Sequence, residues 1–179
     1  MTATPIAIPP HLCVLISELG IAEDMLAARG LIVFEEAEVL ELAELGEDGR
    51  RHLLAPRATA AWFALKEAAL QDGIVLSIVS AFRSVARQTE IVRYKLAAGA
   101  TIDEVMSVCA APGFSEHHTG RAVDITAPGT EALKVEFDQT PAFAWLAGNA
   151  QRFGFHLSYP PGNSKGYQYE PWHWCFHCT

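Results

Sequence analysis

The sequence predicts an α+β fold in which helices flank an antiparallel β-sheet. Helix-like and strand-like segments alternate along the chain, and short strand-like segments that could form hairpins stand at its end. Half of the 179 residues are hydrophobic and 19% are charged, which is a globular composition. A chain of this length can bury its own core, so we expect a single domain.

Residues 1–55 form an acidic and apolar N-terminal segment, which we expect to pack on the same domain without an assigned role. Proline and threonine make the first residues an irregular lead-in, and glycine ends the first short helix. The expected elements are an irregular stretch at 1–10, a helix at 21–29, a strand at 31–34, an ambiguous stretch at 37–45 and a turn at 46–49.

Residues 56–179 form the predicted core of the domain. An Ala-, Leu- and Lys-rich amphipathic pattern predicts a helix over 58–71, which Asp72-Gly73 ends. A β-branched run predicts a central strand over 74–80. The remaining expected elements are helices at 84–98 and 103–109, a loop at 110–119, a strand at 121–125, a helix at 140–153, and strands at 154–158 and 169–176.

The charge and hydropathy of the chain exclude several classes of partner. The net charge of −8 and the pI near 5.3 argue against nucleic acid, because phosphate binding depends on Lys and Arg. No apolar run reaches the length of a membrane span or of a signal-peptide core. We therefore expect a cytoplasmic protein, or a periplasmic or extracellular one if an export signal has been removed. The oligomeric state is left open.

Four cysteines are present, and we expect reduced thiols because a domain of this size does not need a disulfide framework. They are Cys13, Cys109, Cys175 and Cys178. The terminal Cys-x-x-Cys resembles a zinc or redox motif, but no second pair stands at zinc-finger spacing. Cys175 would share a strand face with His173, so it either approaches the groups that surround the metal ligands or, as we favour, is a buried apolar thiol.

Two polar clusters carry the chemistry of the chain, at residues 115–124 and 170–174. On a strand, Gly120, Ala122 and Asp124 share one face, and the two small residues leave clearance around the carboxylate. Either His117 or His118, in the preceding loop, can reach back to Asp124. Spacing does not distinguish these two histidines.

The second cluster supplies Glu170 and His173. In a regular strand these side chains would point to opposite faces, but Pro171 restricts its own backbone and that of the preceding residue. We predict a break there that lets the two side chains converge. Two imidazoles and a carboxylate leave one position on a zinc ion free for water, and Glu170 is the kind of group that takes a proton from that water.

These motifs resemble a known family. Ser115-x-His117-x-x-Gly120-x-Ala122-x-Asp124 followed by Glu170-x-x-His173 is similar to the zinc D-alanyl-D-alanine carboxypeptidases and dipeptidases of the VanY and VanX type. The stretch 80–84 with Gln88 is similar to an upstream motif of that family, which usually has tyrosine where this chain has Phe82. The resemblance covers about residues 56–176.

The resemblance implies a fold shared with the hedgehog signalling domain and one zinc ion per chain. It implies that zinc is held by His117, Asp124 and His173. It further implies Glu170 as general base, Arg83 as the group that stabilises the oxyanion, and Ser115, Gln88 and Arg83 as substrate-binding residues. The loop at 159–168, which precedes the second cluster, is a candidate rim that selects substrate.

The expected function is that of a zinc metallopeptidase, a D-alanyl-D-alanine carboxypeptidase that removes the terminal D-Ala of peptidoglycan stem peptides. Three alternatives stay open: an L,D-carboxypeptidase, an L-alanyl-D-glutamate endopeptidase of the endolysin kind, and a non-catalytic zinc-binding module. Glu170 and Arg83 favour catalysis over the last of these, because a pure binding module needs neither.

Overall fold

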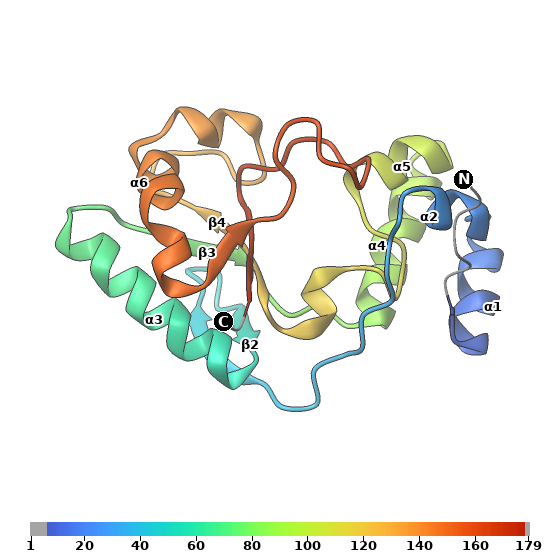
Figure 1. Cartoon of the computed structure of the whole chain (residues 1–179), viewed down its shortest axis with the longest axis horizontal. Coiled ribbons are helices and arrows are strands. Elements are labelled where there is room, and N and C mark those ends of the chain that lie inside the picture. The colour runs from blue at the N-terminus through green and yellow to red at the C-terminus, as the bar shows by residue number, and fades with distance from the viewer. Residues whose placement is uncertain (1–6, 178–179) are drawn as a thin grey trace.

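A four-stranded antiparallel sheet forms the centre of the computed structural model, which describes residues 7–177 (Figure 1). Its strands run in the order β3-β4-β6-β5, with β3 at Ser77–Ser80, β4 at Ala122–Thr126, β6 at His173–Phe176 and β5 at Phe155–Leu157. A separate hairpin pairs β1 (Glu41–Leu45) with β2 (Arg51–Leu54). The prediction of helices around an antiparallel sheet is confirmed.

Six α-helices surround these strands within the described residues, and three short 3₁₀ helices connect them. The α-helices are α1 (Pro10–Glu18), α2 (Glu23–Ala28), α3 (Pro56–Gln71), α4 (Val85–Ala97), α5 (Ile102–Val108) and α6 (Pro141–Asn149). The 3₁₀ helices are η1 (Glu116–Thr119), η2 (Val135–Gln139) and η3 (Ala150–Phe153). No helix in the described part of the chain is long and apolar enough to cross a membrane.

One hydrophobic cluster lies between α3, α6 and the sheet. Pro56 begins α3 at a position where proline's missing N–H and fixed φ suit a helix. The fully buried Trp62 and Leu65 of α3 pack in this cluster with Ile125 of β4 and Phe155 of β5. Each such side chain contributes roughly 1.5–3 kcal/mol by burial, so this cluster fixes the sheet that carries the site described below.

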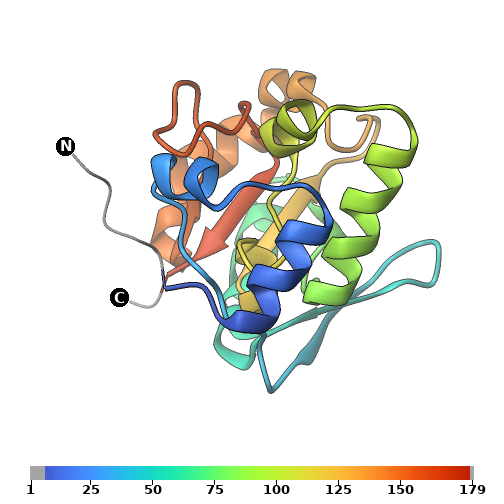
Figure 2. The ribbon, with the colours of Figure 1, turned by 90° about the vertical axis from the view of Figure 1, so that its right-hand side faces the viewer.

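A second hydrophobic cluster joins the N-terminal helices to α4 and α5. Ile16 of α1 and Leu26 of α2 pack with Val92 of α4 and Met106 of α5. In Figure 2, α1 and α2 lie in front of the sheet, with α1 next to α4. The N-terminal segment therefore contributes to the core, whereas a domain division at residue 55 stays a prediction.

Several predicted elements differ from the structure, for local reasons. The expected strand at 31–34 is wrong: the N–H of Leu31 donates to Leu26 O at the end of α2 and that of Phe34 to Gly113 O, so the segment has no strand partner. The expected helix at 140–153 breaks into α6 and η3, because Asn149 has a φ of −127°. Helix α1 was not predicted, since its buried face consists only of Leu12 and Ile16.

Three smaller differences concern element boundaries and a loop. The strand expected at 169–176 begins only at His173, and the loop expected at 110–119 contains η1. The strand expected at 74–80 begins at Ser77.

We predict that Gly120→Ala destabilises the fold by more than Gly129→Ala does. Both glycines have positive φ, of 64° and 79°, so alanine costs about 1–2 kcal/mol at either position. A Cβ at Gly120 would lie 2.9 Å from the backbone nitrogen of Ala55, whereas one at Gly129 would meet nothing within 4 Å. Overpacking should add about 1–3 kcal/mol at Gly120, measured as the free energy of unfolding in urea. Equal losses would contradict this packing.

Candidate active site

The pairing of β4 with β6 creates the centre of the site. Asp124 and His173 are direct partners in this antiparallel register. Side chains of such partners stand on the same face of the sheet, and His173 Nδ1 lies 3.0 Å from Asp124 Oδ1. Backbone pairing alone thus brings together two groups that are far apart in the sequence.

His117 reaches the same point from η1. Ser115 caps this turn, since its hydroxyl accepts the N–H of His117, and Gly120 ends it in the left-handed conformation. His117 Nδ1–H donates to Ala81 O at 2.6 Å, which leaves Nε2 facing Asp124 Oδ2 at 3.3 Å. The backbone carbonyl therefore fixes which nitrogen is available as a ligand.

The structure distinguishes the two histidines that were candidates for the metal ligand. His118 Nδ1–H donates to Arg83 O, and its Nε2 accepts the N–H of Gly113 at 3.1 Å. Both ring nitrogens of His118 are used to tie loops together. The ligand atoms of His117, Asp124 and His173, all buried, lie within 4.8 Å of one another. Two imidazoles and one carboxylate are a donor set that fits a catalytic zinc ion.

Burial and mutual charge set the protonation of these ligands. Burial lowers the pKa of His117 to about 4, so its imidazole is neutral and ready to coordinate. Burial opposes ionisation of Asp124, but the two imidazoles hold the pKa of its carboxyl below the usual range. Burial likewise opposes protonation of His173, but hydrogen bonds to Asp124 and Glu116 raise its pKa. Metal binding must therefore displace a proton from His173.

Glu170 is placed by a tight turn before β6. The N–H of His173 donates to Glu170 O at 3.1 Å, and Pro171 and Trp172 form the turn between them. Glu170 Oε2 lies 3.9 Å from His173 Nδ1. The strand is therefore interrupted at Pro171, as predicted, and the two side chains converge. Burial raises the pKa of Glu170 to about 7, and the charge of Asp124 adds to this effect.

Arg83 enters the site directly after β3. Its Nη2 lies 3.5 Å from Asp124 Oδ2 and donates to Ser80 Oγ, while its Nη1 donates to Gln88 Oε1 at 2.9 Å. The guanidinium is thus held beside the metal ligands by two neutral acceptors. Held in this way, it offers a fixed positive charge close to the candidate metal position.

The three residues expected to bind substrate occupy different places. Arg83 and Ser115 line the cavity, whereas Gln88 is fully buried and does not. The amide of Gln88 donates to Ala110 O at 2.6 Å and to Cys109 Sγ, so this side chain lies behind Arg83 and orients it. Direct contact with substrate stays a prediction for Arg83 and Ser115, and the structure offers Gln88 no such contact in this conformation.

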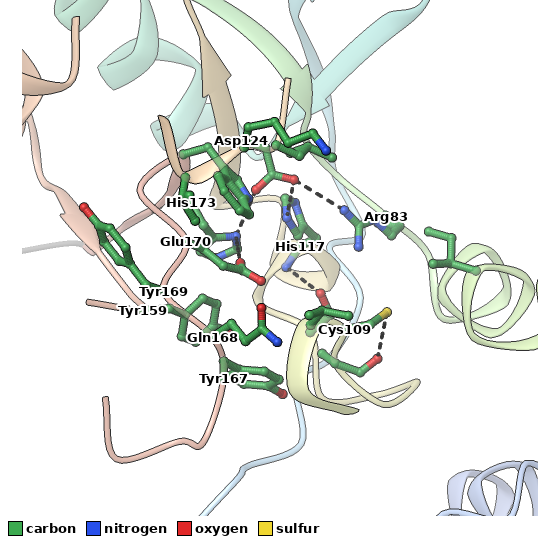
Figure 3. A pocket seen from close by; sticks show the side chains of 18 of the residues that line it. Arg83, Cys109, His117, Asp124, Tyr159, Tyr167, Gln168, Tyr169, Glu170 and His173 are labelled. Carbon is green, nitrogen blue, oxygen red and sulfur yellow. Dashed lines mark hydrogen bonds and ion pairs between the residues drawn. The ribbon is translucent and has the colours of Figure 1, made fainter. Parts of the chain in front are cut away.

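A cavity of about 500 Å³ opens over the candidate ligands, within the size range of small-ligand sites. The expected rim loop contributes Tyr159, Tyr167 and Gln168 to its wall. In the view of Figure 3, Gln168 and Tyr167 lie on the far side of Glu170 from Asp124. Of the two tryptophans beside His173, Trp172 lines the cavity, and Trp174 is buried in the first hydrophobic cluster.

Sequence reasoning missed Glu116, which holds His173 from behind. His173 Nε2–H donates to Glu116 Oε2 at 2.9 Å, and the hydroxyl of Ser158 donates to the same oxygen at 2.6 Å. A carboxylate on the outer nitrogen fixes the ring and its tautomer, so that Nδ1 faces the metal position. The only signal in the sequence was the place of Glu116 next to His117.

The cysteines with described positions, Cys13, Cys109 and Cys175, are free thiols. Cys178 lies outside the described residues, so its pairing with Cys175 stays untested. Cys175 is buried, and burial together with the nearby Glu116 carboxylate raises the pKa of its thiol. The predicted burial of Cys175 is confirmed, but its thiol lies beside the Glu116 carboxylate, so its surroundings are not purely apolar.

A buried His–Asp–His group beside a carboxylate is the arrangement of a zinc peptidase centre. The family model of VanY, D-alanyl-D-alanine carboxypeptidase, matches residues 51–179, so the chain belongs to this family. A D-alanyl-D-alanine carboxypeptidase of Enterococcus faecalis is 35% identical over 120 residues, or 62% of this chain and 43% of the relative. The putative carboxypeptidase YodJ of Bacillus subtilis is 34% identical over 110 residues, or 60% of this chain and 40% of the relative. The chain thus spans less than half the length of these curated relatives.

Solved structures agree with this assignment. VanYB in complex with D-alanine-D-alanine is 31% identical, with a TM-score of 0.64 and coverage of 81% of each chain. The LdcB LD-carboxypeptidase is also 31% identical, with a TM-score of 0.65 and coverage of 82% of this chain and 66% of the other. A mutant VanY D,D-pentapeptidase with Zn(II) is 31% identical, with a TM-score of 0.59 and coverage of 77% and 79%. The hedgehog-like peptidase fold is therefore confirmed.

We predict that Glu116→Ala weakens zinc binding by about 10–100-fold, because loss of an outer carboxylate frees the His173 ring. Glu116→Gln keeps a hydrogen-bond acceptor without the charge and should give an intermediate affinity. The measurement is a competitive zinc titration against a chromophoric chelator. Glu38→Ala, at an exposed glutamate of the N-terminal segment, is the matched control. An unchanged affinity in Glu116→Ala would contradict this role.

Proposed function

We propose that this chain is a zinc-dependent D,D-carboxypeptidase that removes the terminal D-Ala from peptidoglycan stem peptides, with one zinc ion per chain. The observation that carries the proposal is the convergence of His117, Asp124 and His173 with Glu170 in one buried site. Membership of the VanY family supports the same substrate class.

The charge of the cavity suits a peptide with a free terminal carboxylate. Arg83, Lys95 and Lys134 line it and can bind that carboxylate, while Asp124 and Glu170 of the same cavity belong to the metal site and Glu136 lies on its wall. Guanidinium and ammonium donors bind a carboxylate with charge-assisted hydrogen bonds. A carboxypeptidase needs this recognition, whereas an endopeptidase that cuts within the released stem does not.

The reaction uses water as nucleophile. A zinc ion held by His117, Asp124 and His173 would supply a Lewis acid that polarises the scissile carbonyl and acidifies water. Glu170 accepts the proton of the attacking water as the oxygen–carbon bond forms, then donates it to the leaving amine as the carbon–nitrogen bond breaks. A pKa of about 7 allows Glu170 to act in both directions near neutral pH.

Arg83 supports the same step from the other side of the site. Negative charge develops on the carbonyl oxygen as water adds, and a preorganised guanidinium stabilises it without reorganisation. The bonds from Arg83 to Ser80 and Gln88 provide this preorganisation. We assign the oxyanion role to Arg83 and a supporting role to Gln88.

An L,D-carboxypeptidase is the second candidate, because LdcB matches this chain with the same identity as VanYB and a TM-score within 0.01. Both activities would release a terminal D-Ala, and the same four groups of this chain would serve either one. They differ only in the residue on the amino side of the scissile bond. Action in the cytoplasm, on released wall fragments, stays a prediction.

Digestion of synthetic stem peptides tests the function directly. We expect the zinc-loaded protein to release one D-Ala from a pentapeptide stem that ends in D-Ala-D-Ala, detected as the mass lost. Treatment with a chelator should abolish release, and added zinc should restore it. Cleavage of a tetrapeptide stem instead would favour the L,D activity. A zinc-loaded protein that cuts none of the stems would contradict a peptidase.

We predict that Glu170→Gln lowers kcat by about 10²–10⁴-fold, because the amide cannot accept the proton of water. Zinc content should stay at the wild-type value, since Glu170 is not among the predicted ligands. Steady-state kinetics measures kcat, and metal analysis of the same sample measures the zinc content. Glu136→Gln, at another carboxylate of the cavity wall, is the matched control and should turn over normally. Wild-type turnover in Glu170→Gln would overturn the assignment of the base.

A further inference from the structure

Arg29, which lies upstream of the family match, connects the N-terminal segment to the rim of the cavity. It stands at the C-terminal end of α2. Its Nε–H donates to Lys165 O at 2.6 Å, and its Nη1–H donates to Met106 O at 2.8 Å. Its guanidinium also lies over the ring of Tyr167, 4.4 Å from the centroid. One side chain thus holds two separate segments, the end of α5 and the rim loop at 159–168.

The rim loop also donates a hydrogen bond to the N-terminal segment. Lys165 Nζ donates to Gly30 O, so the loop and the end of α2 are tied in both directions. Within the loop, Asn163 donates to Tyr167 O at 2.8 Å, and its side-chain oxygen accepts the N–H of Lys165. The segment around Tyr167 therefore has its conformation fixed from inside the loop and from the N-terminal segment.

A chain of ring contacts leads from Arg29 to the candidate metal ligands. The ring centroids of Tyr167 and Tyr159 are 4.7 Å apart, and those of Tyr159 and His173 are also 4.7 Å apart. Tyr159 and Tyr167 line the cavity, and Tyr159 O accepts the N–H of Glu170. Displacement of Tyr167 would therefore alter the cavity wall within two side chains of His173.

We propose that Arg29 is a positioning residue that fixes the rim loop and thereby sets the substrate cavity of this chain. The inference rests on the proposed function, because the cavity is taken to bind a stem peptide. Arginine is required in this role, because its planar fork reaches two carbonyls and a ring face at once. Residues outside the family match thus help determine how tightly substrate binds.

Kinetics of Arg29→Ala test the proposal. We expect KM for the stem peptide that the wild type cleaves to rise about tenfold, with kcat within about twofold and zinc content unchanged, because the wall moves while Glu170 and the ligands stay. Arg29→Lys keeps a cation near Tyr167 but cannot hold both carbonyls, so it should give an intermediate KM. A KM within twofold of wild type in Arg29→Ala would overturn the proposal.

Trypsin provides a readout that does not depend on activity. Cleavage after Lys165 should become at least fivefold faster in Arg29→Ala, because the carbonyl of Lys165 loses its partner in the N-terminal segment and only the bond from its amine to Gly30 O remains. If the wild type cleaves no stem peptide, the proposed function fails, and this assay still tests whether Arg29 holds the loop. An unchanged cleavage rate would show that it does not.

Arg93→Ala is the matched control. Arg93 of α4 also links to the N-terminal segment, since its Nη2 lies 3.7 Å from Glu18 Oε2, but both side chains are exposed and neither contacts the rim loop. We expect wild-type KM and wild-type trypsin sensitivity. Tyr167→Leu removes the ring on the other side of the contact and should raise KM as Arg29→Ala does, which keeps a test available if Arg29→Ala does not fold. Equal effects of Arg93→Ala and Arg29→Ala would overturn the proposal.

Discussion

The antiparallel register of β4 and β6 is the constraint on which the rest of the site depends. It sets Asp124 opposite His173 and so brings together a carboxylate and an imidazole that are far apart in the sequence. The turn before β6 then adds Glu170, and η1, which leads into β4, adds His117. A slip of one residue would turn His173 to the other face of the sheet and break up the candidate metal site.

Burial is the second organising effect, because it separates the protonation states of neighbouring groups. The same apolar surroundings keep His117 neutral and raise the pKa of Glu170 to about 7, while Asp124 stays ionised between two imidazoles. Groups behind the ligands complete this arrangement. Glu116 holds His173, and Gln88 holds Arg83, so neither functional side chain depends on a single contact.

The candidate metal ligands and the proposed substrate-selecting loop lie on different parts of the molecule. The ligands belong to the sheet and to one short turn, which the cluster around α3 makes rigid. Part of the cavity wall belongs to the rim loop at 159–168, and Arg29 ties that loop to α2 and the end of α5. Such a division lets substrate preference change through the loop and the N-terminal segment while the metal site stays the same.

The sequence by itself predicted a site made of imidazoles and carboxylates and an interrupted strand at Pro171, because these follow from short spacings that strand alternation and proline geometry control. The role of Glu170 as general base stays a prediction. Only the tertiary structure decided between His117 and His118, because the choice depends on carbonyls of residues 81 and 83, more than thirty residues away. The same holds for Glu116, for the position of Gln88 behind Arg83 and for the lack of a strand partner at residues 31–34. Each of these depends on a partner that is distant along the chain, and a spacing rule contains no information about such partners.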